Sequence, residues 1–168
     1  FLSFIFFDIP IVTLGPDTSF CYGESIILNP TGDPAYTWSW NNPNGLSCTN
    51  CVSPVASPSG NNFYIAKAEI AQCEAYDSIF LTILPLPNTN AGPNQSICLN
   101  DSIELNGSGA DSLKWSPSTF LNDSNNANTW AHPTQNITYY LLGVDTSSSC
   151  QKNDSLTITV NPLPTANA

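Results

Sequence analysis

Alternating apolar and polar residues predict short β-strands along most of this chain. The clearest alternation runs over 77–83, where Ile79, Leu81 and Ile83 occupy every second position, and it returns over 154–160. A period of two is typical of a half-buried strand. Apolar stretches at 26–28, 36–40 and 63–70 lie between segments rich in Gly, Pro, Asn and Ser, which favour turns. The pattern therefore predicts an all-β chain.

A repeat of 77 residues organises this pattern. The segment 15–29 returns as 92–106 with its glycine, proline, cysteine and following strand in register, and Pro-Leu-Pro at 85–87 returns at 162–164. Recurrence at a fixed period indicates tandem structural units. We expect two β-sandwich domains, residues 11–87 and 88–168, joined by an extended Pro-x-Pro linker.

Inside the second domain the offset changes with position. Trp115 matches Trp38 at 77, whereas Tyr140 matches Tyr64 at 76 because the intervening loop is shorter. The matched tryptophans are expected in the cores. Trp40 and Trp130 have no partner in the repeat, so packing against a neighbouring domain is one interpretation and contact with a sugar ligand is the other.

Residues 1–10 are predicted to be a third closing strand with its linker, although the repeat has only two bodies. Leu2, Phe4 and Phe6 align with Ile79, Leu81 and Ile83, while Ile5 and Phe7 make the opposite face apolar too. An exposed apolar edge strand promotes aggregation. This extra N-terminal β-strand should therefore complete a preceding domain of the same chain or be donated to a neighbouring copy.

Composition excludes several classes of partner. The 168 residues carry 13 acidic side chains, three lysines and no arginine, a net charge of −10. This charge repels phosphate, so we expect neither nucleic acid nor an anionic membrane as partner, and the apolar run at 1–7 is too short to span a bilayer. A single histidine and no recurring acidic pair leave no catalytic constellation, so the chain is not expected to be an enzyme.

The six cysteines fit the repeat. Cys21 and Cys73 are 52 residues apart, as are Cys98 and Cys150, so these pairs are predicted to be disulfides, with Cys48 bonded to Cys51. A zinc site or a redox motif at the Cys-x-x-Cys are the alternatives. No cofactor is expected, a structural calcium ion on the acidic loops being the alternative.

The motif Gly-Pro-Asn-Gln-Ser-Ile-Cys at 92–98, Trp115-Ser116-Pro117, Tyr139-Tyr140 and the Thr-Ile-Thr-Val-Asn-Pro-Leu-Pro ending resemble tandem repeats of Bacteroidetes surface proteins. These are Ig-like or PKD-like domains of gliding-motility-associated and type IX-secreted adhesins. The resemblance covers both domains and implies an extracellular stalk, filament or adhesive array. Trp40, where the second domain has Pro117, departs from the pattern.

The same resemblance implies O-glycosylation at Asp-Ser followed by an apolar residue. Four serines match: Ser78, Ser102, Ser112 and Ser155. Turn chemistry before a strand is the alternative explanation. We expect a secreted, non-enzymatic structural module whose partners are copies of itself, neighbouring repeats or surface glycans, with an adhesin or glycan-binding module as the alternative.

Overall fold

The structure, a computed structural model, describes residues 9–33 and 35–164, and the chain divides into two compact units between Pro85 and Leu86. The described residues contain twelve strands and no helix. Unit 1 holds β1 (Thr18–Cys21), β2 (Ile26–Ile27), β3 (Thr37–Asn41), β4 (Val55–Ala56), β5 (Asn62–Ile70) and β6 (Cys73–Leu84). Unit 2 holds β7 (Gln95–Cys98), β8 (Ile103–Asn106), β9 (Ser112–Ser116), β10 (Asn128–Ala131), β11 (Ile137–Val144) and β12 (Gln151–Asn161). The predicted strand at residues 1–7 lies outside the described residues.

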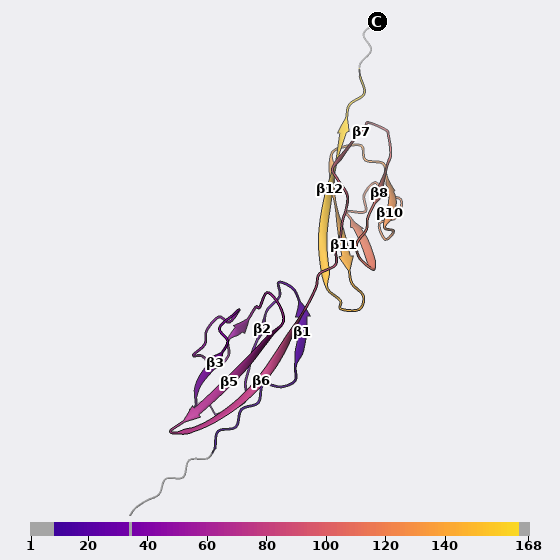
Figure 1. The fold of residues 1–168 in the computed structure, drawn as a ribbon. Helices are drawn as coiled ribbons and strands as arrows, with labels where there is room; N and C mark the ends of the chain where they lie inside the picture. Colours follow the sequence, from indigo (N-terminus) through magenta and orange to yellow (C-terminus); the bar gives the residue numbers. More distant parts are fainter. Residues whose placement is uncertain (1–8, 34, 165–168) are drawn as a thin grey trace, which may run out of the picture. The chain divides into compact units, whose positions relative to one another are not determined.

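Both units have the same sheet topology (Figure 1). In unit 1 a four-stranded sheet has the order β1-β6-β5-β3 and a two-stranded sheet pairs β2 with β4; unit 2 repeats this as β7-β12-β11-β9 and β10-β8. β1 is parallel to β6 and β7 is parallel to β12, whereas all the other strand pairs are antiparallel. This is the arrangement of an immunoglobulin-type sandwich. The prediction of two tandem Ig-like β-sandwich domains is confirmed.

Each sandwich encloses its own core. Strand residues alternate between inside and outside, as in β3, where the residues at 38 and 40 are buried and those at 37 and 41 are exposed. The core of unit 1 contains Leu28, Trp38, Trp40, Ala56, Tyr64, Ala66, Ala68, Ile79 and Leu81. The core of unit 2 contains Ala91, Ile97, Leu105, Trp115, Ala131, Tyr139, Leu141, Leu156 and Ile158. Period-two alternation is thus sufficient to bury one face of each strand.

The structural equivalence of the two units differs from the sequence alignment at one tryptophan. Trp40 pairs with Ala66 on β5, and Trp115 pairs with Leu141 at the same register on β11, an offset of 75 for both residues. The equivalent of Trp115 is therefore Trp40 rather than Trp38. The loop that leads into β9 is two residues shorter than the loop that leads into β3. The change of offset from 77 to 75 therefore occurs before the tryptophan. The structural counterpart of Trp38 is Leu113.

The tyrosine match is also corrected. Tyr64 and Tyr139 are fully buried, whereas Tyr140 is exposed. The hydroxyl of Tyr64 donates to the carbonyl of Asn44, and that of Tyr139 donates to the carbonyl of Thr119 at 2.8 Å. Tyr139 at offset 75, not Tyr140 at 76, is therefore the counterpart of Tyr64. Burial raises the pKa of Tyr139 to about 12, which keeps its hydroxyl a donor.

Candidate functional site

The two ends of each unit are built differently. One end carries the β5–β6 or β11–β12 turn and is called the hairpin end; at the other, the exit end, β6 or β12 leaves the sheet. The residues before β1 and β7, called the lead-in segments (11–17 and 88–94), join the sheet near the hairpin end, because Leu14 contacts Asp77 and Ala91 contacts Asp154. In each unit the chain thus arrives at one end and departs at the other.

A repeated carboxylate holds each lead-in segment. The N–H of Leu14 donates to Oδ2 of Asp77 at 2.7 Å, and the N–H of Ala91 donates to Oδ2 of Asp154 at 2.7 Å. These backbone bonds, from Ala91 first and Ser155 second, lower the pKa of the Asp154 carboxyl. In the sequence these aspartates were assigned only to the Asp-Ser motifs, although the 77-residue offset between them was visible.

Two glycines let the second lead-in segment approach the sheet. A Cβ on Gly109, whose φ is +91°, would overlap the carbonyl of Asn88, and one on Gly143 would overlap the side chain of Thr89. Thr89 itself is buried. The close approach of the lead-in backbone therefore requires glycine at both positions.

The disulfide predicted between Cys48 and Cys51 is formed, with Cα atoms 6.0 Å apart. It staples the loop that packs over Trp40. The Trp40 backbone N–H donates to the Thr49 carbonyl at 2.8 Å, and its indole N–H donates to the Cys51 carbonyl at 2.8 Å. In unit 2 the indole of Trp115 makes the corresponding bond to Ala127 without a disulfide.

The two long-range disulfides that the spacing predicted are not formed, since Cys73 and Cys98 are free thiols. In unit 1, Cys21 lies opposite Leu84 at the exit end, while Cys73 opens β6 at the hairpin end. Eleven residue steps of about 3.3 Å separate Cys73 from Leu84, roughly 36 Å. A disulfide joins Cα atoms about 4.4–6.8 Å apart, so Cys21 and Cys73 cannot bond within the unit.

Unit 2 has the same geometry. Cys98 lies opposite Asn161 at the exit end, and Cys150 directly precedes the first residue of β12 at the hairpin end. Ten residue steps of β12 separate these ends, again more than about 30 Å. The correction therefore applies to Cys98–Cys150 as well. Cys21 and Cys150 are themselves in the disulfide-bonded state.

The serines of the Asp-Ser motifs lie in different settings. Ser102, Ser112 and Ser155 are exposed and Ser78 is half-buried. The carboxylates that precede Ser78 and Ser155 hold the lead-in segments, as described above, and the carboxylate of Asp111 accepts from the backbone N–H and the hydroxyl of Thr146. Three of the four motifs thus have a structural explanation. Modification of the serines stays a prediction.

The two tryptophans proposed as ligand contacts have opposite environments. Trp40 is 6% exposed and belongs to the core, so it cannot stack on a ligand without unfolding of its unit. Its position two residues from Trp38 puts both indoles on one strand face, which the alternation rule already implied. Trp130 on β10 is 46% exposed, and its neighbour across the sheet is Glu104. Trp130 alone remains a candidate contact.

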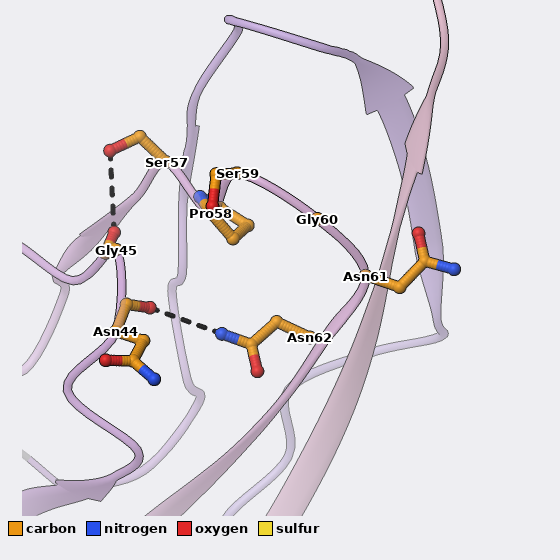
Figure 2. A pocket seen from close by; sticks show the side chains of 8 residues that line it. All are labelled: Asn44, Gly45, Ser57, Pro58, Ser59, Gly60, Asn61 and Asn62. Atoms are coloured by element: carbon orange, nitrogen blue, oxygen red, sulfur yellow. Dashed lines mark hydrogen bonds between the residues drawn. The ribbon is translucent and has the colours of Figure 1, made fainter.

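The loop region of unit 1 contains a polar surface hollow of about 470 Å³ (Figure 2). It is lined by Asn44, Gly45, Ser57, Pro58, Ser59, Gly60, Asn61 and Asn62. Asn62 donates to the carbonyl of Asn44 and to the hydroxyl of Tyr64, and its own Oδ1 accepts from Asn42. These polar groups are therefore engaged within the protein, where they anchor the buried Tyr64.

No metal-ligating group of three or more His, Cys, Asp or Glu side chains occurs within residues 9–33 and 35–164. In that same part of the chain, no helix has the length and apolar character needed to cross a bilayer.

Comparison with known proteins finds distant similarity to solved structures. No protein-family model and no curated protein matches the sequence. Among solved structures, Drosophila OTK extracellular domains 3–5 align at 8% identity over 90% of this chain and 62% of that one, with a TM-score of 0.43. The insect immune protein hemolin aligns at 12% identity over 90% of this chain and 47% of that one, with a TM-score of 0.47. Titin domains z1z2 align at 14% identity over 95% of this chain and 100% of that one, with a TM-score of 0.41. This chain spans less than two thirds of the first two structures. The assignment of the fold rests on the strand order described above.

Proposed function

We propose that this chain is a non-enzymatic structural module of an extracellular bacterial stalk or filament made of tandem Ig-like units. The observation that carries the proposal is the polarity of each unit: the chain arrives at the hairpin end and leaves at the exit end, by the same strand pairing in both. A unit built this way can be repeated end to end without a change of design.

An oxidising environment is supported by the cysteine chemistry. The Cys48–Cys51 disulfide lies in a surface loop, and disulfides persist mainly in secreted and surface proteins. The polar, acidic composition and the resemblance to Bacteroidetes surface repeats support the same location. Gliding-motility-associated or type IX-secreted arrays are the finer assignment within this proposal.

The apolar segment at residues 1–7, which the sequence predicts to be a strand, provides the proposed route to polymerisation. Donated to the open edge of a neighbouring copy, it would satisfy its backbone and produce a head-to-tail filament. The test is negative-stain electron microscopy of the full chain, of a chain lacking residues 1–9, and of a Phe4→Asp/Phe6→Asp variant that keeps the length. Filaments from the full chain alone support donation. Particles of two units from all three chains would overturn it.

A second function, glycan binding, is favoured by the exposed Trp130. Aromatic side chains present a flat apolar face with a polar edge, which suits a sugar ring. Binding to a glycan array that is lost in Trp130→Ala, while circular dichroism shows the fold intact, would support an adhesin. Equal binding by the wild-type chain and the variant would remove Trp130 from consideration.

A further inference from the structure

The two free thiols stand at opposite kinds of end. Cys98 lies at the exit end of unit 2, opposite Asn161 where β12 leaves the sheet. Cys73 lies at the hairpin end of unit 1, where it opens β6 opposite Ile70. One chain therefore carries one free thiol of each type, and the cysteine 52 residues away from each lies at the other end of the same unit.

The repeat indicates what these positions are for. Cys98 occupies the place that Cys21 occupies in unit 1, and Cys73 occupies the hairpin-end place that Cys150 occupies in unit 2. Both equivalents are disulfide-bonded. Because each end position is bonded in one unit and free in the other, a free thiol here is an unused bonding site rather than a buried structural cysteine.

Both thiols are at least partly exposed at the surface of their units. Cys98 is exposed and lies in an open surface hollow of about 550 Å³, lined also by Ser96, Asn100 and Asp101. Cys73 is half-buried directly after the turn at Ala71, whose φ of 55° reverses the chain. A hairpin end of one copy that meets the exit end of another makes a heterologous, head-to-tail contact.

We infer that Cys98 of one chain forms a disulfide with Cys73 of a second copy of this chain, linking exit end to hairpin end. A thiol at an exit end bonds to a thiol at a hairpin end, because in a tandem array the exit end of one unit is followed by the hairpin end of the next. This inference goes beyond the proposed function, since a stalk or filament needs no covalent bond between its copies. Repetition of the bond gives an open covalent chain.

The reaction balances by thiol–disulfide exchange with a disulfide oxidant. The thiolate of Cys98 attacks the oxidant, breaks its S–S bond and releases one thiolate, which gives a mixed disulfide. The thiolate of Cys73 from the second copy then attacks the protein sulfur and releases the second thiolate. Two protein thiols lose two protons and two electrons, and one disulfide oxidant becomes two thiols.

The test uses oxidised glutathione as the oxidant, on the full chain and on the variants Cys73→Ser and Cys98→Ser. Each variant retains one free thiol, so they can be kept apart or mixed, with one carrying a mass tag. Salt near 0.5 M reduces the repulsion between two chains of charge −10. Products are separated by gel electrophoresis in SDS without reductant, so that filaments held only by non-covalent contacts do not count.

The wild-type chain should give a ladder of covalent oligomers. Each variant alone should stay monomeric, and the mixture should give severalfold more dimer than either, with a Cys73–Cys98 peptide in the mass spectrum. Homodimers of the separate variants as abundant as the mixed dimer would overturn the inference. A wild-type chain that only becomes glutathionylated at both thiols would overturn it too. Circular dichroism of the variants excludes misfolding as the cause of either result.

Discussion

Replacement of Trp40 by phenylalanine measures whether this residue is a core anchor or a ligand contact. The indole is 6% exposed and donates its N–H to the Cys51 carbonyl at 2.8 Å. Phenylalanine leaves that carbonyl without its donor, which costs about 1–3 kcal/mol. The smaller ring also leaves a void of a few tens of Å³, worth about 1 kcal/mol at ~24 cal/mol per Å³. The free energy of unfolding of unit 1 should fall by about 2–4 kcal/mol.

Urea denaturation followed by circular dichroism detects this loss, and hydrogen-exchange mass spectrometry assigns it to peptides of unit 1. With a slope near 1 kcal/mol per molar urea for a domain this small, the midpoint should move by about 2–4 M. Trp130→Phe is the matched control. Its side chain is 46% exposed, so the free energy of unfolding of the control should change by less than about 0.5 kcal/mol. Equal effects of the two substitutions, or none at Trp40, would refute the placement of Trp40 in the core.

Three further predictions concern the lead-in segment and the stapled loop. Gly109→Ala should destabilise unit 2 by more than about 3 kcal/mol in thermal melts, because the added Cβ overlaps the lead-in backbone. Gly92 has a positive φ but open space around it, so Gly92→Ala should cost only about 1–2 kcal/mol. Equal costs would contradict the close approach of the lead-in backbone to Gly109. Asp154→Asn should make stability less dependent on pH at the acid side. The lowered pKa of Asp154 gives stability that is present above the ordinary aspartate pKa and is lost as pH falls through the folded-state pKa. An unchanged pH dependence would argue against the role of Asp154 in holding the lead-in segment. The double variant Cys48→Ser/Cys51→Ser should lose about 2 kcal/mol, the chain-entropy value for so short a loop, in unit 1 alone by hydrogen exchange; protection lost in unit 2 would be unexpected.

The class of fold could be predicted from the sequence because a strand requires only alternation. The alternation marks one inward face in each closing strand, at residues 79, 81 and 83 and at their counterparts 156, 158 and 160. The 77-residue repeat lets a strand assigned in one unit be checked against the other. Turn residues between the strands then exclude long helices. These signals are local, so they survive without knowledge of tertiary contacts.

The tryptophan match could not be predicted, because identity alone gave two candidates. Trp38 and Trp40 are both inward-facing on β3, and either can be aligned with Trp115 by a change of two residues in loop length. The choice depends on which central-strand residue lies opposite, Ala66 in one unit and Leu141 in the other. That register is a tertiary property, set by the pairing of strands far apart in the sequence.

The cysteine pairing failed for a related reason. Equal spacing of 52 residues is kept by two cysteines bonded to each other and equally by two cysteines that are not bonded to each other. Only the parallel pairing of β1 with β6 and of β7 with β12 shows that the two members lie at opposite ends. Parallel pairing of sequence-distant strands has no local signature, so the spacing could not reveal it.

The most direct measurement is a disulfide map of the protein purified without reductant, by proteolysis and mass spectrometry with free thiols blocked beforehand. We expect a Cys48–Cys51 peptide and no peptide that joins Cys21 to Cys73 or Cys98 to Cys150, because each of those two pairs spans the length of a sheet. A Cys21–Cys73 or Cys98–Cys150 peptide as a major product would contradict the strand register, and with it the assignment of hairpin and exit ends on which the array proposal depends.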